Sequence, residues 1–99
     1  MAEYELDKHR YRELKHFCLQ YHKFKRIVST WSEGTLEYEN AIRLIEKTAA
    51  DASIKYQEWI LAAAVNDISY SRLKPPLNRI EFEYFLRRFY WLLSNRKGY

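Results

Sequence analysis

The chain has 99 residues, 47% of them hydrophobic, which suffices for one domain with a single core and excludes a two-domain enzyme. Seventeen Lys and Arg against thirteen Asp and Glu give a formal net charge of +4, which favours a polyanionic partner. Only two glycines and two prolines are present, so collagen-like, linker-like and low-complexity chains are excluded.

The single cysteine, Cys18, predicts a chain without an internal disulfide. No Cys and His residues have zinc-finger spacing, so we expect neither a metal nor a cofactor. No apolar run approaches the roughly 18 residues needed to span a bilayer, and residues 1–12 are too polar for a signal peptide. These features predict a soluble protein of the cytoplasm, with no membrane partner.

A long, basic N-terminal helix is predicted over residues 7–31. Its apolar stripe has spacings of three and four: Leu14, Phe17, Cys18, Tyr21, Phe24, Val28 and Trp31. We expect Gly34 to end this stretch in a left-handed conformation and Thr35 to cap the next helix. The segment from residue 8 to 27 holds seven Lys or Arg and one acid, which suits either phosphate contact or an ordinary solvated face.

Two further helices are predicted in the region 36–66, over 36–49 and 52–66, with Asp51 and Ser53 as cap residues between them. The periodicity leaves open whether they form one continuous rod. The expected inward side chains are Tyr38, Ile42, Ile45 and Ala49 on the first and Ile54, Leu61, Ala64 and Val65 on the second.

Within the region 69–95, the sequence predicts a short helix over 69–73, a break at Pro75-Pro76 and a last helix over 78–95. Asn78 with Glu81 three residues later is a variant of the capping box. The buried stripe of the last helix is Phe82, Phe85, Leu86, Phe89, Leu92 and Leu93. The fold class is therefore an all-α bundle of four to five helices in one domain, 1–99, with a helix-turn-helix-like C-terminal half.

The exposed side of the last helix carries Arg79, Glu83 and Arg87 at four-residue spacing. In a helix-turn-helix the second helix enters the major groove, where arginine addresses guanine edges or phosphates. Equally, the three side chains form an ion-pair ladder in solvent, and Glu83 repels phosphate. The candidate DNA-binding residues are Arg72, Lys74, Asn78, Arg79, Glu83, Arg87, Arg88, Arg96 and Lys97.

Seventeen aromatic residues are more than a core of this size needs, so some rings should be exposed. The candidates for a protein interface are Tyr84, Tyr90, Trp91 and Tyr99. Such rings suit a homodimer or a partner protein, whereas the alternative is a thick aromatic core. Catalytic motifs are absent from the sequence; Cys18 with His16 or His22 is the only imaginable thiol and base, so we expect no enzyme and no small-molecule substrate.

Two segments, Arg10–Tyr21 (RYRELKHFCLQY) and Arg87–Leu93 (RRFYWLL), resemble short uncharacterised proteins encoded in phages and prophages of Gram-positive bacteria. The part from 52 to 97 is similar to the sigma-factor-like helix-turn-helix of phage late-gene transcription activators. Unlike that pattern, this chain has no glycine at the turn between the helices, where Lys74–Leu77 stands. The resemblance implies a role in gene control, with the segment 69–88 presented to DNA.

The leading hypothesis is a non-catalytic, phage-type transcriptional regulator that binds double-stranded DNA as a homodimer. The competing hypothesis is a small phage-encoded module that binds a host protein, as an inhibitor, adaptor or anti-defence factor. Either would act in the host cytoplasm.

Overall fold

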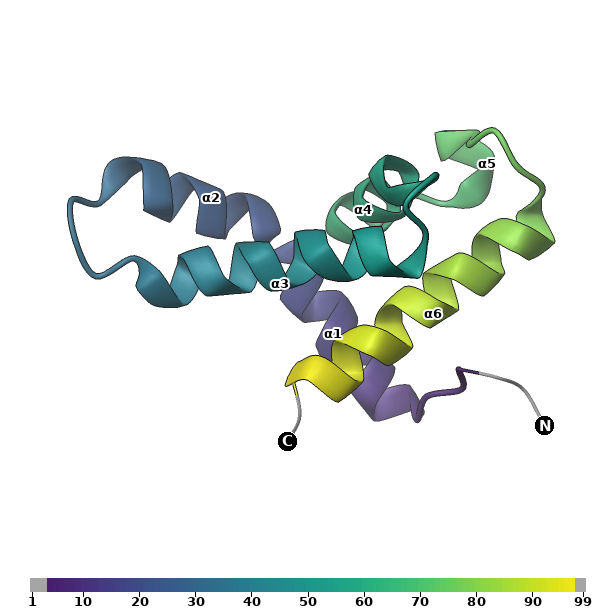
Figure 1. The fold of residues 1–99 in the computed structure, drawn as a ribbon, viewed down its shortest axis with the longest axis horizontal. Coiled ribbons are helices and arrows are strands. Elements are labelled where there is room, and N and C mark those ends of the chain that lie inside the picture. Colours follow the sequence, from purple (N-terminus) through teal and green to yellow (C-terminus); the bar gives the residue numbers. More distant parts are fainter. Residues whose placement is uncertain (1–3, 98–99) are drawn as a thin grey trace.

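The computed structural model describes residues 4–97, and every regular element within that range is an α-helix, so the chain is all-α as predicted. The elements are α1 (Lys8–Leu19), α2 (Tyr21–Thr30), α3 (Leu36–Ala52), α4 (Gln57–Asn66), α5 (Tyr70–Leu73) and α6 (Arg79–Lys97). The protein extends 44 × 29 × 21 Å. In Figure 1, α2 and the first part of α3 lie side by side and project from a body that contains α1, α4, α5 and α6.

The long N-terminal helix is present as two helices joined at Gln20, where the chain changes direction (Figure 1). The amide of Gln20 donates to the carbonyl of Phe17, three residues earlier, at 3.2 Å. This is the bond of a 3₁₀ turn, which is wound more tightly than an α-helix. After this kink α2 packs on α3, whereas α1 packs on α4 and α6. The apolar stripe of residues 14–31 therefore packs on two different sets of helices. Because its spacing continues through Gln20, the sequence pattern does not indicate the kink.

The left-handed conformation predicted for Gly34, in the turn between α2 and α3, is confirmed by its φ of 76°. Thr35 is the N-cap residue of α3, as predicted, but its side chain accepts no backbone amide; its hydroxyl donates to the carboxylate of Glu39 at 3.2 Å instead. Trp31, expected in the buried stripe, is 52% exposed at this turn.

Helices α3 and α4 are separate, because α3 continues to Ala52 and α4 begins only at Gln57. Ser53 is extended, and its hydroxyl accepts the amide of Tyr56 at 3.3 Å, while Asp51 lies inside α3. The prediction that Ile54 is buried is wrong: it falls in this turn and is 79% exposed.

The start of α6 has the predicted capping box. Asn78 Oδ1 accepts the amide of Glu81 at 2.8 Å, and the Asn78 side-chain amide donates to the Glu81 carboxylate at 2.8 Å. Further along, Phe82, Phe89 and Leu93 are buried in one core with side chains of α1, α3 and α4: Leu14, Cys18, Ile45 and Ile60. The core therefore fixes α6 against the other long helices.

One arginine of the basic N-terminal segment lies inside the protein. Arg10 is 6% exposed, and its guanidinium donates to the hydroxyl of Ser94 at 2.9 Å and to the Ser94 carbonyl at 3.0 Å. A buried charge needs such partners to offset its lost hydration. Arg10 therefore ties α1 to the C-terminal part of α6.

Candidate nucleic-acid interface

The segment from α4 to α6 has the helix, short helix, turn and long helix order of a helix-turn-helix (Figure 1). α5 is one turn long and ends at Leu73, and its C-cap residue, Lys74, has a φ of 51°. Lys74 thus adopts the left-handed conformation that a glycine would normally supply at such a turn. The hydroxyl of Tyr70 donates to the carbonyl of Leu77 at 2.6 Å and so braces the turn across the two prolines.

The first half of α6, from Arg79 to Arg87, presents polar side chains to solvent. Arg79 lies 3.7 Å from the Glu83 carboxylate, bonds the Ser71 hydroxyl at 3.3 Å and stacks 5.5 Å from the centre of the Tyr70 ring. More than half of each side chain in the Arg79–Glu83 pair is exposed, so the pair is weak and readily exchanged. Arg87 is exposed, and its side chain bonds to no other residue in the range 4–97.

The second half of α6 uses its cations within the monomer. Arg88 donates to the Tyr4 hydroxyl at 2.9 Å, and Arg96 forms a 2.6 Å ion pair with Asp51. The Lys97 ammonium lies 4.0 Å from the centre of the Phe17 ring. These three side chains were expected to contact DNA, and in the structure each also contacts another part of the chain.

The aromatic side chains predicted for a protein interface also have partners inside the chain. The centre of the Tyr4 ring lies 5.5 Å from that of Tyr84 and 5.3 Å from that of Trp91. These two rings therefore hold the N-terminal segment, residues 4–7, against α6. Tyr90, expected to be exposed, is 3% exposed and belongs to the core. Tyr99 lies outside the described residues.

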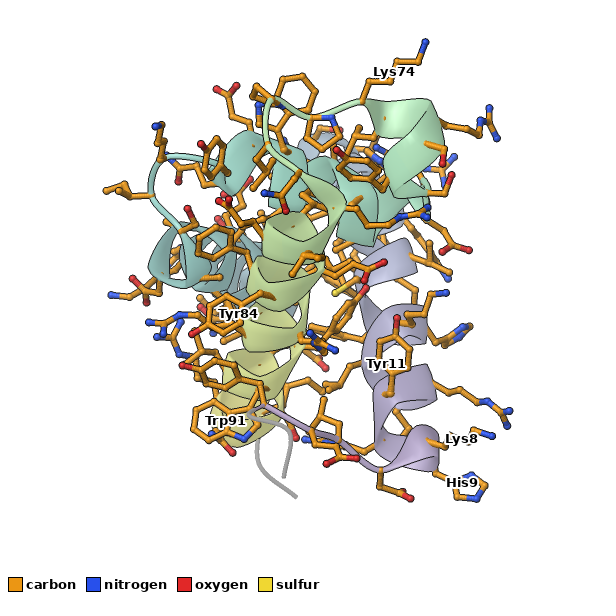
Figure 2. The ribbon with its side chains drawn as sticks, turned by 90° about the vertical axis from the view of Figure 1, so that its right-hand side faces the viewer. Lys8, His9, Tyr11, Lys74, Tyr84 and Trp91 are labelled. Atoms are coloured by element: carbon orange, nitrogen blue, oxygen red, sulfur yellow. The ribbon has the colours of Figure 1, made fainter. Side chains whose placement is uncertain are left out.

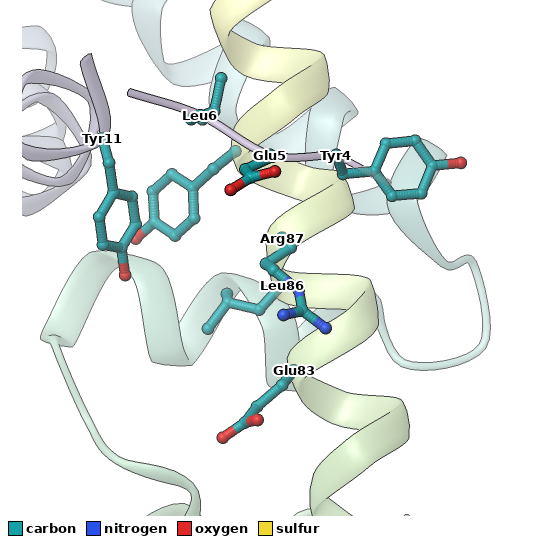
Figure 3. A pocket seen from close by; sticks show the side chains of 8 residues that line it. Tyr4, Glu5, Leu6, Tyr11, Glu83, Leu86 and Arg87 are labelled. Atoms are coloured by element: carbon teal, nitrogen blue, oxygen red, sulfur yellow. The ribbon is translucent and has the colours of Figure 1, made fainter. Parts of the chain in front are cut away.

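A cleft of about 420 Å³ separates α1 from α6 next to these residues. Leu6, Leu86 and the tyrosines line its apolar part, and Figure 3 shows the Arg87 side chain between those of Glu5 and Glu83. The N-terminal segment therefore lies beside the middle of α6, because Tyr4 contacts both Tyr84 and Trp91. The most open part of α6 is its start, at Arg79 and Ile80.

Cations from α1 and α5 lie on the same side of the molecule. Lys8, Arg12 and Lys15 share one face of α1 by their spacing, and Tyr11 beside them lines the cleft. Figure 2 shows this side, with Lys74 at its upper end and Lys8 near its lower end. Lys15 forms a 3.0 Å ion pair with Asp67, which raises the pKa of Lys15.

Five exposed cations form no ion pair or side-chain hydrogen bond with any residue in the described part of the chain: Lys8, Arg12, Arg72, Lys74 and Arg87. Sequence reasoning assigned α1 mainly a solvated face, because spacing along one helix does not reveal which other helix lies next to it. Two nearby carboxylates, those of Asp67 and Glu83, are already paired with Lys15 and Arg79. Glu5 also lines the cleft beside Arg87, so acids and unpaired cations are both present here.

The lone thiol is in the core. Cys18 is fully buried, and burial raises its pKa to about 12, so the thiol stays protonated and is a poor nucleophile. The side chains of His16 and His22 are exposed, and His22 bonds the Asn66 side chain at 2.7 Å. Residues 4–97 hold no cluster of three or more His, Cys, Asp or Glu suited to a metal ion. None of the helices found there combines the length and apolar character needed to cross a membrane.

Comparison with protein-family models, with curated proteins and with solved structures finds no match to this chain.

Proposed function

We propose that this protein is a non-catalytic, phage-type transcriptional regulator that binds double-stranded DNA with α5, the turn after it and the first half of α6. The observation that carries the proposal is the set of three cations on α5, the turn after it and the first half of α6 that form no ion pair within residues 4–97: Arg72, Lys74 and Arg87. The regulator would act in the cytoplasm of the phage's host.

In this arrangement the first half of α6 lies in the major groove. Arg79 and Arg87 address guanine edges or phosphates, and Ile80, which is 79% exposed, meets a thymine methyl group. Arg72 and Lys74 bind the phosphates beside the turn, while Lys8 and Arg12 of α1 reach the flanking backbone. Asn78 keeps its role as the cap that fixes the first turn of α6.

The proposal is tested by fluorescence anisotropy with a labelled duplex from upstream of the protein's own gene, measured over a range of salt concentrations. We expect affinity to fall steeply with salt, because each neutralised phosphate adds about 0.9 to the slope of log K against log salt. Arg79→Ala with Arg87→Ala should weaken binding at least about tenfold and lower that slope by up to about 2.

The matched control is Lys47→Ala with Lys55→Ala, which removes the same charge from α3 and the turn that follows α3. Lys74→Gly is a useful third variant, because glycine keeps the left-handed turn while removing a proposed phosphate contact. Circular dichroism would verify the fold of each variant. Absence of binding at low salt, or equal losses in the double variant and its control, would refute the proposal.

A second candidate is the protein-binding module, favoured by the apolar side chains around Arg87. Ile80 is 79% exposed, while Tyr11 and Tyr84 are 38% and 36% exposed, so this side also offers hot-spot residue types. Under this alternative the duplex gives no anisotropy change at low salt. A partner protein then binds the chain, Ile80→Ala weakens the complex, and Arg72→Ala does not.

A further inference from the structure

The cleft between α1 and α6 is bounded by the N-terminal segment, residues 4–7, and this segment is held at both ends. The Tyr4 ring contacts two aromatic rings of α6, and the Asp7 carboxylate accepts the amide of Arg10 at 3.4 Å as the cap of α1. Between these contacts, Leu6 packs on the core. The walls are therefore formed by the folded chain itself, and the volume of about 420 Å³ lies within the range of about 300–1,000 Å³ that is typical of small-ligand sites.

The cleft also contains a buried hydroxyl without a partner. Tyr90 lines the cleft although the residue is only 3% exposed, and its hydroxyl has no hydrogen bond with any residue in the range 4–97. In that range the one unbonded side-chain nitrogen or oxygen that is sealed from solvent is Arg88 Nε, so the Tyr90 hydroxyl is not sealed and opens into the cleft. Because buried polar groups normally have hydrogen-bond partners, this hydroxyl indicates a polar ligand.

Charges of both signs line the cleft side by side. Figure 3 shows the Arg87 side chain between those of Glu5 and Glu83. Arg87 forms an ion pair with neither of them, and Glu83 has only its exposed contact with Arg79. The two carboxylates would repel a purely anionic ligand, and Arg87 would repel a purely cationic one. A ligand that carries both charges close together meets an opposite charge at each of them.

The rest of the lining is apolar. Leu6 and Leu86 lie in the cleft together with the rings of Tyr11 and Tyr90, which meet edge to face at 5.1 Å. An apolar group placed against these side chains leaves water, which favours binding. In a free α-amino acid the ammonium, the carboxylate and the side chain are joined to one carbon, whereas each end of a peptide carries only one of the two charges.

We propose that this cleft binds a free α-amino acid with an apolar side chain, represented by leucine. The ligand carboxylate accepts hydrogen bonds from Arg87, and the ligand ammonium donates to Glu5. The Tyr90 hydroxyl, which is both a donor and an acceptor, bonds the polar end of the ligand. The side chain packs on Leu6 and Leu86.

The test is an NMR titration of the ¹⁵N-labelled chain, whose mass of 12.1 kDa suits the method, with L-leucine. Arg87 also belongs to the proposed DNA surface, so nucleic acid is left out and the outcome is independent of that proposal. We expect the amides of Glu5, Leu6 and Arg87 to shift with a dissociation constant of about 1 mM or below. L-Leucinamide, which lacks the carboxylate, and 4-methylpentanoate, which lacks the ammonium, should each bind at least about tenfold more weakly.

Arg87→Gln and Glu5→Gln should each weaken leucine binding at least about tenfold, because each removes one of the two charge contacts. The matched controls are Arg72→Gln and Glu37→Gln, which remove the same charges from exposed residues outside the cleft and should leave the dissociation constant unchanged.

Tyr90→Phe separates binding from packing, since it removes the unpartnered hydroxyl and keeps the buried ring. It should weaken leucine binding several-fold without lowering the free energy of unfolding. No shifts with leucine up to about 10 mM would overturn the inference. So would equal affinity for leucine and either analogue, or unchanged affinity in both Arg87→Gln and Glu5→Gln.

Discussion

The two halves of α6 contain the same kinds of residue but use them differently. From Arg79 to Arg87 the arginines are exposed, and their strongest partner is the solvent-exposed Glu83. From Arg88 to Lys97 each cation contacts a distant part of the same chain. An arginine-rich helix is therefore not by itself a binding surface, because neighbouring elements decide which guanidinium groups remain free.

The difference follows from what lies beside each half. The second half passes between α1 and α3, where Phe89 and Leu93 are fully buried, so even its polar residues are near other chain segments. The start of the first half contacts α5, where Arg79 meets Ser71 and Phe82 meets Tyr70, and the first half buries one large side chain, Phe82. Stability and recognition are thus separated along one helix, and this separation can be measured.

The largest expected contrast is in packing. Phe89→Ala should lower the free energy of unfolding by about 3–5 kcal/mol, because it removes a fully buried ring and leaves a cavity. Ile80→Ala in the first half should change it by less than about 0.5 kcal/mol, because that side chain is in solvent. Urea denaturation followed by circular dichroism measures both. Comparable losses in the two variants would remove the distinction between the halves.

The adjacent pair Arg87 and Arg88 sharpens the contrast further. Arg88→Ala should cost about 1–2 kcal/mol, since it removes the bond to Tyr4 and loosens the N-terminal segment. Arg87→Ala should leave stability within about 0.5 kcal/mol of wild type. DNA affinity should show the opposite order once the Arg88 variant is measured well below its unfolding temperature. A stability loss at Arg87 as large as that at Arg88 contradicts the comparison.

A third expectation concerns pH, because the second half of α6 helps to enclose Cys18. Burial raises the thiol pKa from 9.0 to about 12, so above pH 9 the unfolded chain loses this proton while the folded chain keeps it. Stability should therefore fall by up to about 1.4 kcal/mol from this group between pH 9 and 10. Cys18→Ala should reduce the slope in that window, and the remaining slope near pH 10 comes from Tyr21 and Tyr90, because burial raises their pKa as well.

Local signals in the sequence predicted much of the fold. The Asn78–Glu81 cap, the left-handed Gly34 and the buried stripe of α6 each depend on residues within one or two helical turns. The kink at Gln20 was missed because the apolar spacing continues through it. Its position follows from the different partners of α1 and α2, which spacing along the chain does not contain.

The candidate site was predictable only in part, for the same reason. Arg88 and Arg96 are indistinguishable from Arg87 by sequence, yet their partners, Tyr4 and Asp51, lie 84 and 45 residues away. The position of α1, whose start lies beside the C-terminal part of α6 and places Lys8 there, likewise depends on long-range packing. Side-chain identity selected the candidates, and tertiary contacts decided which of them are free.

The smallest expected effect on stability is also the sharpest test of the first half of α6. Glu83→Gln removes the exposed partner of Arg79, and such i,i+4 pairs contribute no more than about 0.5 kcal/mol. Stability should therefore barely change. In contrast, affinity for the duplex should rise several-fold at low salt, because the substitution frees Arg79 and removes a negative charge from the face that meets phosphate.

Glu58→Gln is the appropriate comparison, since it removes one exposed acid from α4 and gives the same change in net charge. If both substitutions increase affinity equally, the gain reflects overall charge alone, and the first half of α6 has no special place in binding. If Glu83→Gln weakens binding, its carboxylate accepts a hydrogen bond from the duplex, as an acid does from a cytosine amino group. That result would keep α6 in the groove and change the base it reads.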